Sequence, residues 1–458
     1  MRMKRMVLFH KTPAIWSKLD YVEEAFQTDL SPIEDGTLEE DSEIFSLFYS
    51  DIYIRLCESI CHNLGIEELH IVQGFSEGER RNWINGEKKG RYQIDDLSTY
   101  WCVDSPKELL SFLDADVLFS RGNYQTFHHY LHQHRSENAN PTWIHYPATA
   151  LMFPHLFSYE QKFLTFAENP DGKRNFHKQI TGMNVEHQLP NVEESDDSDY
   201  DKMLANLTSY AHNRRETKNV GPYDFVLVDD ETSIKLYEGI YQNSIILKFT
   251  KPANLVPLDF KYERKYDLIF CGTTLQATKN HMQFITLLKR LDHELGKQLR
   301  VAIAGNRGDI PAFSQGLTKQ YEHIIIDDFG ELPRTELHEL FNDTKAIVIL
   351  SGRDCNPRII QEAGLCGTFV IVADTMSDGL EILKNNPLLG SVIPTKKASW
   401  FYQRNGNLLF EVNRNFAIRV LSAVDTANSP FLVRKISHQK YSMRKASEFI
   451  SDQIKTLR

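Results

Sequence analysis

The chain has 458 residues, of which 41% are hydrophobic and 25% are charged, and its formal net charge is −10. This is an ordinary globular composition, and the length exceeds what one hydrophobic core usually supports, so we expect two domains. Proteins held on nucleic acid by phosphate contacts are normally basic, so the charge argues against nucleic acid as a standing partner. No apolar run approaches the ~18 residues of a membrane-spanning helix, which favours a cytoplasmic protein and leaves only a peripheral membrane contact open.

The first half of the chain alternates short apolar runs with amphipathic stretches, the pattern of βα units and parallel sheets. Residues 41–63 have helical periodicity. An acidic run at 193–199, with few apolar residues around it, indicates that residues 158–222 form a solvated insertion rather than a chemical site. Strands are expected at Val7–Phe9, Leu69–Val72, Val117–Phe119, Thr142–Tyr146 and Phe225–Val228.

The second half repeats this alternation more regularly and predicts a doubly wound α/β domain. It follows residues 250–266, which contain two prolines and are expected to link the halves. The expected strands are Asp267–Cys271, Leu299–Ala304, Ile324–Ile326, Ala346–Leu350 and Phe369–Val372. The expected helices are His281–Leu295, Thr335–Asn342 and Arg358–Leu365.

Glycines mark the edge of this domain where a ligand is expected. In an open α/β sheet, ligands bind beyond the carboxyl ends of the strands, at the point where the strand order reverses. Four glycines come just after predicted strands: Gly272, Gly305, Gly330 and Gly352. They therefore predict the binding edge of the second domain.

The most informative segment is 350–363, where an apolar strand leads through a polar loop into a helix. Asn356 is expected to cap this helix and Pro357 to be its first residue, because proline lacks the N–H group that would be unsatisfied there. The free N–H groups and the positive dipole of such a helix end can bind phosphate. Asp354 and Glu362 can each hold a pair of vicinal hydroxyls, as on a sugar and a ribose.

This segment resembles the donor-site signature of the retaining GT-B glycosyltransferases of family 4. That signature has two acidic residues separated by seven, then alanine, a helix and a glycine before the next strand. The sequence supplies these landmarks in order: Asp354, Glu362, Ala363, Gly367 and Phe369–Val372. Upstream, residues 267–280 resemble the family's strand, glycine, loop and lysine, and residues 329–333 resemble its loop at the nucleotide base. Several landmarks in order over residues 265–380 are more specific than any single motif.

The resemblance implies the GT-B fold, with two Rossmann-like domains facing a cleft. It implies transfer of a hexosyl unit from a nucleoside diphosphate sugar with retention of configuration, without a metal or a cofactor. Glu362 would hold the ribose, Asp354 the hydroxyls of the transferred sugar, and Lys279 the diphosphate. The other residues implied at the donor site are Gly272, Thr273, Gly305, Arg307, Phe329, Gly330, Arg353, Asn356, Pro357 and Arg358.

The implied domains are residues 1–255 on the acceptor side, residues 256–430 on the donor side, and residues 431–458 as a helix that packs back on the first domain. In the first domain, residues 143–146 resemble a family strand that ends in the active-site histidine, here His145. Together with Lys279 and Asp354, it is a candidate catalytic residue. The acceptor stays open: a glycan or lipid-linked glycan of surface polysaccharide or glycolipid synthesis, a protein, or a small molecule.

Three departures from the family keep an alternative open. Asp354 stands where glutamate is usual, Thr273 stands where an arginine usually follows the first glycine, and residues 9–13 lack the usual Gly-Gly turn. Three arginines can replace the missing phosphate cation: Arg307, Arg353 and Arg358. The alternative is a catalytically silent GT-B protein that binds a sugar nucleotide or a partner.

Other enzyme classes fit less well. A phosphorylase would need a lysine for pyridoxal phosphate in a recognisable context, which the sequence lacks. Residues 305–308 are too short for a dinucleotide fingerprint, so hydride transfer is a poor rival. Asp114 and Asp116 imitate the metal-binding acid pair of the other large glycosyltransferase fold, but they stand at the start of a strand. No metal site is therefore expected.

Overall fold

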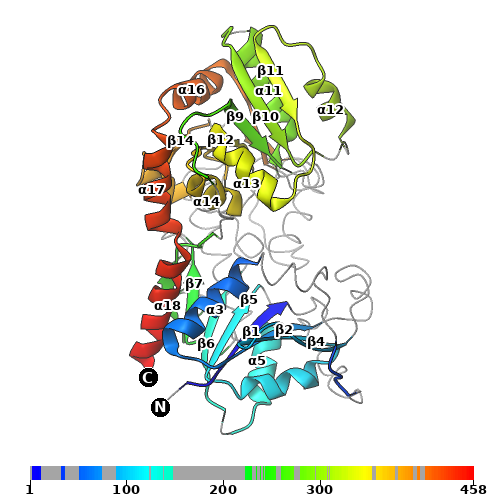
Figure 1. Cartoon of the computed structure of the whole chain (residues 1–458), viewed down its shortest axis with the longest axis vertical. Coiled ribbons are helices and arrows are strands. Elements are labelled where there is room, and N and C mark those ends of the chain that lie inside the picture. The colour runs from blue at the N-terminus through cyan, green and yellow to red at the C-terminus, as the bar shows by residue number, and fades with distance from the viewer. Residues whose placement is uncertain are drawn as a thin grey trace, which may run out of the picture. The chain divides into compact units, whose positions relative to one another are not determined.

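In the computed structural model, the described residues form two compact units, each built on its own sheet (Figure 1). The first unit comprises the described residues within 1–148, 206–254 and 443–458, and the second comprises those within 255–442. The structure describes residues 3–11, 32–36, 51–74, 89–122, 125–137, 139–147, 222–229, 234, 238, 241, 243–253, 259–272, 279–293, 295–306, 308, 310–352, 357–376, 380–395, 400–402 and 408–458. None of the helices among them is long and apolar enough to cross a membrane.

The first unit contains an eight-stranded sheet in the order β3-β4-β2-β1-β5-β6-β7-β8. Its strands are β1 (Arg5–Lys11), β2 (Glu68–Gly74), β3 (Gly90–Gln93), β4 (Ser98–Val103), β5 (Val117–Arg121), β6 (Thr142–Tyr146), β7 (Phe225–Val228) and β8 (Ile245–Lys248). Only the pair of β3 and β4 is antiparallel. Every residue of β6 and β7 is buried, as in parallel sheets whose two faces are both covered.

Two helices far apart in the sequence pack together on this sheet. Asp51 caps α3 (Ile52–Leu64) by accepting hydrogen bonds from two N–H groups of the first turn, at 2.8 and 3.2 Å. Beside α3 lies α18 (Met443–Leu457), where the Asn63 amide donates to the Ser447 hydroxyl at 3.0 Å (Figure 1). The last helix of the chain therefore belongs to the first unit.

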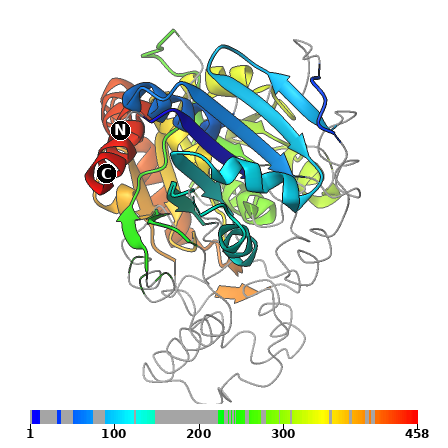
Figure 2. The ribbon, with the colours of Figure 1, turned by 90° about the horizontal axis from the view of Figure 1, so that it is seen from below.

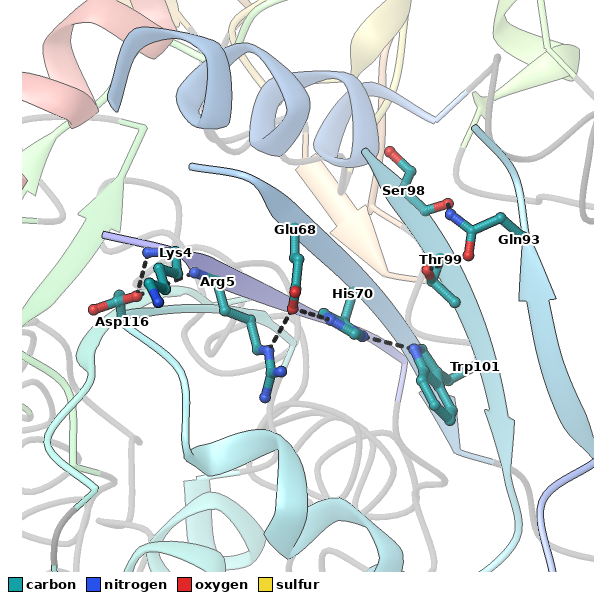
Figure 3. Close-up of polar contacts among 9 residues, drawn as sticks. All are labelled: Lys4, Arg5, Glu68, His70, Gln93, Ser98, Thr99, Trp101 and Asp116. Carbon is teal, nitrogen blue, oxygen red and sulfur yellow. Dashed lines mark hydrogen bonds and ion pairs between the residues drawn. The ribbon is translucent and has the colours of Figure 1, made fainter. Parts of the chain in front are cut away.

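Polar side chains tie β1, β2 and β4 together near their amino ends (Figure 3). Glu68 accepts hydrogen bonds from Arg5 at 2.9 Å and from His70 at 3.3 Å, and the Trp101 indole donates to Nδ1 of His70 at 2.8 Å. Burial lowers the pKa of His70, so the neutral ring carries its proton on Nε2, the nitrogen that faces Glu68. The network thus links three adjacent strands of the sheet.

Asp116, one of the two acids that imitate a metal-binding pair, has a structural role in this sheet. Its carboxylate accepts hydrogen bonds from the backbone N–H groups of Lys4 at 2.6 Å and Arg5 at 3.1 Å (Figure 3), and it pairs with Arg458 at 3.2 Å. The two ends of the described chain consequently lie close together on the first unit (Figure 2).

The second unit contains a six-stranded parallel sheet in the order β11-β10-β9-β12-β13-β14. Its strands are β9 (Tyr266–Cys271), β10 (Leu299–Ala304), β11 (Ile324–Asp328), β12 (Thr344–Ile349), β13 (Phe369–Ala373) and β14 (Gly390–Ile393), with a separate hairpin of β15 (Trp400–Tyr402) and β16 (Leu408–Phe410). From β9 the chain runs outward to β10 and β11, and it then returns to build β12, β13 and β14 on the other side. The strand order therefore reverses between β9 and β12.

Described helices connect the strands of this sheet, as expected for a doubly wound domain. They are α11 (His281–His293), α12 (Pro311–Leu317), α13 (Arg334–Asn342), α14 (Arg358–Leu365) and α15 (Leu380–Lys384). Two further helices of this unit, α16 (Arg414–Asp425) and α17 (Pro430–Tyr441), follow β16. Residues 431–458, expected as one helix, are divided between α17 and α18, because Ser442 between them has an extended backbone with ψ of 128°.

One prediction about a helix end is wrong. The sequence predicts Pro357 as the first helical residue, but α14 begins at Arg358 and Pro357 occupies the cap position, with φ of −60° and ψ of 134°. This ψ lies outside the helical region, so the helix starts one residue later. Proline has no side-chain acceptor, and α14 has no side-chain cap in the described part of the chain.

Candidate functional site

The carboxyl edge of the second unit's sheet holds the predicted donor-site residues that the structure describes. Gly272 follows β9, Gly305 follows β10, and the α14 amino end follows β12. The reversal of strand order between β9 and β12 makes this edge the place where doubly wound folds bind ligands.

Gly272 allows the chain after β9 to pass close to Lys279. A Cβ atom on Gly272 would lie 3.1 Å from Cβ and Cγ of Lys279, closer than side chains normally approach. Burial raises the pKa of the neighbouring Cys271 thiol to about 12, with Lys279 lowering it and Glu362 raising it. Both charged groups therefore influence the pKa of this thiol.

Asn280 fixes the turn that follows Lys279. Its φ is 59°, which among the described residues makes it the only non-glycine residue with a positive φ. Asparagine tolerates this left-handed conformation better than most residues. Its buried side chain donates from Nδ2 to the carbonyl oxygen of Leu350 at 2.7 Å. The bond joins the turn after β9 to the end of β12, across the point where the strand order reverses.

His281, the residue after Asn280, also contacts the chain that follows β9. Its Nε2 lies 3.1 Å from the carbonyl oxygen of Gly272, and its ring packs edge-on against Phe313 at 4.9 Å. Burial lowers the pKa of His281, an effect opposed by the bond to Gly272 and reinforced by Lys279. The ring is therefore neutral at pH 7, and Nε2 carries the proton that it donates to Gly272.

Glu362 projects from α14 and is held by α13. Its side chain is 10% exposed, Oε1 lies 2.9 Å from Nη2 of Arg334, and Oε2 lies 3.8 Å from Nε2 of His338. Burial raises the pKa of Glu362, but His338, Arg334 and Arg358 together hold it below its ordinary value. The carboxylate is therefore ionised. Two oxygens provide about four acceptor positions, more than these two contacts use.

The glycines after β10 and β11 form a second rigid part of the edge. The Gly305 N–H donates to the Gly330 carbonyl at 2.6 Å, and both residues have positive φ, 84° and 63°. Asp328 accepts a hydrogen bond from the Gly330 N–H at 3.0 Å. The Phe329 ring between them is 40% exposed and lies edge-on against Tyr266 at 5.9 Å.

His145 lies inside the first unit, on β6. Its ring is fully buried, its Nδ1 lies 2.9 Å from the Ser120 hydroxyl, and it stacks on Tyr223 with 4.0 Å between ring centres. Burial lowers the pKa of His145 well below its ordinary value, so the ring is neutral. Its Nε2 has no hydrogen-bond partner among the described residues. The catalytic role of His145 stays a prediction.

A charged cluster lies at the carboxyl edge of the first unit's sheet, where its strand order reverses between β1 and β5. Oδ2 of Asp51 lies 3.2 Å from Nε2 of His10 and 3.4 Å from Nη1 of Arg121. The Arg121 guanidinium lies over the Tyr53 ring at 4.1 Å. Burial raises the pKa of Asp51, but His10 and Arg121 lower it far below its ordinary value. The first unit therefore also has a polar cluster at the carboxyl edge of its sheet.

The predicted and the observed site residues differ in two ways. Five predicted donor residues lie outside the described residues: Thr273, Arg307, Arg353, Asp354 and Asn356. The sequence analysis missed Asn280, Arg334 and His338. A usable signal existed for Asn280, because asparagine directly after a loop lysine is suited to a left-handed turn.

No group of three or more metal-ligating side chains occurs within the part of the chain that the structure describes.

The comparisons with known proteins first define the class of the fold. Sucrose-phosphate synthase from Thermosynechococcus elongatus matches with 11% identity and a TM-score of 0.52, over 99% of each chain. The E. coli trehalose-6-phosphate protein bound with UDP-2-fluoro glucose matches with 10% identity and a TM-score of 0.51, over 98% of this chain and 99% of that chain. Anabaena HepE in complex with UDP gives 10% identity and a TM-score of 0.51, over 99% and 100%. The two Rossmann-like units are thus those of the GT-B fold, as predicted.

The family match is confined to the second unit. Residues 259–401 match the family model described as glycosyl transferases group 1. A search of curated proteins finds no match. The resemblance to GT-B glycosyltransferases is therefore confirmed by the whole-chain fold and by the family model that matches the second unit.

Proposed function

We propose that the chain transfers a hexosyl unit from a nucleoside diphosphate sugar to an acceptor hydroxyl with retention of configuration and without a metal ion. The observation that carries this proposal is the hydrogen bond that joins two loops at the carboxyl edge of the second unit's sheet. There Asn280 ties the Lys279 turn to the end of β12, the strand that precedes α14 with its paired and ionised Glu362. UDP is the first nucleotide to test, because two structural neighbours are described with UDP or a UDP sugar.

In the proposed site, three groups of residues at the carboxyl edge bind three parts of the donor: the ribose, the base and the diphosphate. Glu362 accepts hydrogen bonds from the ribose hydroxyls, and Phe329 with Gly330 contacts the base. Lys279 and the amino end of α14 bind the diphosphate. When the bond between the sugar and the diphosphate breaks, the leaving group takes the electron pair. The same lysine and helix end then stabilise the negative charge that develops on it.

The remaining parts of the proposal concern the reacting sugar and the acceptor. Asp354 is proposed to hold hydroxyls of the transferred sugar, and His145 is proposed to orient it. The acceptor classes are a glycan, a lipid-linked glycan, a protein and a small molecule, with surface polysaccharide or glycolipid synthesis as the proposed setting. The polar edge formed by Asp51 and Arg121 is proposed as part of the acceptor side.

A two-stage experiment tests this function. Thermal shift with UDP, GDP, ADP and CDP should show stabilisation by at least one nucleotide, because a ligand that binds only the folded state raises the melting temperature. Proton NMR of donor hydrolysis should then show that the released sugar first appears with the anomeric configuration of the donor. Stabilisation without turnover would identify the catalytically silent alternative. Inversion would contradict the proposed mechanism, and no nucleotide binding would contradict the function.

A further inference from the structure

The amino edge of the second unit's sheet, opposite the proposed donor edge, is hollowed on both sides of Asn428. One hollow, of about 640 Å³, reaches the starts of β10 and β12 at Leu299 and Lys345. The other, of about 330 Å³, reaches the starts of β13 and β14 at Phe369 and Gly390. Asn428 lines both. The two hollows therefore adjoin along one sheet edge, and we call them together the amino-edge groove.

An exposed aromatic ring lines the larger hollow. Tyr262 is 68% exposed, although its ring is held edge-on against Phe260 with 5.0 Å between centres. Phe260 is held in turn by two guanidinium groups, those of Arg264 at 5.2 Å and Arg434 at 4.9 Å. An aromatic side chain that is fixed but left open to solvent in a hollow is a typical recognition element. Its face can pack against the C–H face of a sugar ring.

Two ion pairs beside this ring offer groups that bind hydroxyls. Nζ of Lys345 lies 2.6 Å from Asp267, and Nζ of Lys297 lies 3.0 Å from Asp425. Three of these four side chains are 40–49% exposed, and Asp267 is 23% exposed. Carboxylate oxygens accept hydrogen bonds and ammonium groups donate them, so each pair can bind a hydroxyl in either sense.

The charges of the groove nearly cancel. Its positively charged lining residues are Arg264, Lys297, Lys345 and Arg419. Its negatively charged lining residues are Glu263, Asp267 and Asp425. A site for a polyanion would have a clear excess of positive charge. The balance instead favours an uncharged ligand with many hydroxyls.

We propose that the amino-edge groove binds a chain of neutral sugars, with Tyr262 as the stacking platform. Because the two hollows adjoin at Asn428, the ligand spans more than one sugar unit. This site lies at the edge of the sheet opposite the proposed donor site and shares none of its residues. Glycan binding here therefore does not depend on the proposed transferase activity. An experiment that contradicts the glycan site leaves the proposed donor site untouched, and the reverse also holds.

Calorimetric titration of the full chain with maltoheptaose, cellohexaose and mannohexaose tests the proposal, with heparin and a mixed peptide library as the competing ligand classes. At least one neutral glycan should bind, and its longer oligomers should bind more tightly than its disaccharide. Tyr262→Ala should weaken this binding at least tenfold, whereas Tyr262→Phe, which keeps the ring, should stay within about twofold of the parent. Ile325→Ala, which removes another exposed apolar side chain of the same unit outside the groove, should have no effect.

Glu362→Ala, which alters the proposed donor edge, should leave glycan binding unchanged even where it weakens UDP binding. The proposal is overturned if none of the three glycans binds, or if Tyr262→Ala leaves their affinity intact. It is also overturned if heparin or peptides compete for Tyr262 more strongly than every neutral glycan.

Discussion

Among the residues of the proposed donor site, Glu362 has the most clearly defined partners. The sequence places a carboxylate at this point, four residues after Arg358 on the same predicted helix, a spacing that allows an ion pair within the helix. The structure instead brings Arg334 from α13 to 2.9 Å and His338 to 3.8 Å. Such partners arise from packing between two helices, which no periodicity within one helix reveals. The identity of the acid was predictable, and its electrostatic support was not.

If Glu362 holds the ribose, Glu362→Ala should weaken UDP binding roughly tenfold to a hundredfold, because a charge-assisted hydrogen bond contributes roughly 1.5–3 kcal/mol. Binding of 2′,3′-dideoxy-UDP should hardly change, since it lacks the hydroxyls concerned. Calorimetry with both nucleotides measures the difference, and Glu339→Ala, which removes an exposed acid of α13, is the control. Equal loss for both nucleotides, in a variant that melts normally, would mean that Glu362 acts on the fold.

Two of the buried histidines of the first unit, His128 and His145, predict a pH dependence of stability. Burial lowers the pKa of His128 to about 3, against an ordinary value of 6.5. Between these values the unfolded chain binds a proton that the folded chain does not, so stability falls as the pH falls below about 6.5. His145, whose pKa is also lowered, acts in the same direction.

Chemical unfolding at pH 7.5 and pH 5.0, followed by tryptophan fluorescence, measures this loss, since Trp143 lies 5.3 Å from the His128 ring. His128→Gln should reduce the loss by about 2 kcal/mol, because one proton changes the free energy of unfolding by about 1.4 kcal/mol per pH unit. His134→Gln, at an exposed position, should leave it unchanged. The same loss in His128→Gln and in the parent would contradict the account.

His145→Ala separates packing from catalysis in the same cluster. Removing a fully buried ring that stacks on Tyr223 should destabilise the first unit by about 3 kcal/mol, within the range for large-to-small core substitutions. If the ring also orients the sugar, kcat should fall much more than nucleotide affinity falls. Turnover, nucleotide affinity and melting temperature are measured on one preparation. A lower melting temperature with normal turnover below it would exclude the catalytic role.

At the scale of the elements, the turn between β9 and α11 has a backbone conformation that restricts which residue can occupy it. Asn280 combines a left-handed backbone with a bond to Leu350. Asn280→Ala should therefore lower stability by roughly 1–2 kcal/mol through backbone strain, with a further loss from the missing bond. Asn280→Gly should relieve the strain without restoring the bond, so its melting temperature should recover while UDP binding stays weak. Full UDP affinity in both variants would show that the tie to β12 does not shape the site.

The elements also show what pattern reading can and cannot find. The strands Leu299–Ala304, Thr142–Tyr146 and Phe225–Val228 occur with the predicted bounds, because each is a largely apolar run of the expected length. The short edge strands β3 (Gly90–Gln93) and β8 (Ile245–Lys248) were not predicted. Each has four residues, too few for an alternation to stand out, and each pairs with the strand next to it in the chain order.

At the scale of the whole molecule, the fold was more predictable than the site. Repeated βα alternation and the order of several landmarks were enough to predict the two Rossmann-like units of the GT-B fold. The bond that ties the Lys279 turn to the end of β12 depends on the reversal of strand order between β9 and β12. A sequence indicates that such a reversal exists but does not state which loops it brings together.

The proposed reaction without a metal ion is tested on the whole molecule. If Lys279 and the α14 amino end supply the positive charge that the leaving diphosphate needs, transfer or donor hydrolysis should continue in excess EDTA. Rates measured before and after chelation should agree within about twofold. Loss of turnover in EDTA that manganese restores would contradict this prediction and would require a metal-binding group on the donor path.

The central claim is that the carboxyl edge of the second unit binds a nucleoside diphosphate, and calorimetric titration of the full chain with UDP and with uridine tests it most directly. The parent should bind one UDP per chain. Lys279→Ala should weaken UDP binding at least tenfold while leaving uridine binding within about twofold, because only UDP carries the phosphates that the lysine contacts. Absence of UDP binding in the parent, or equal affinity of the parent and Lys279→Ala for UDP, would contradict the account.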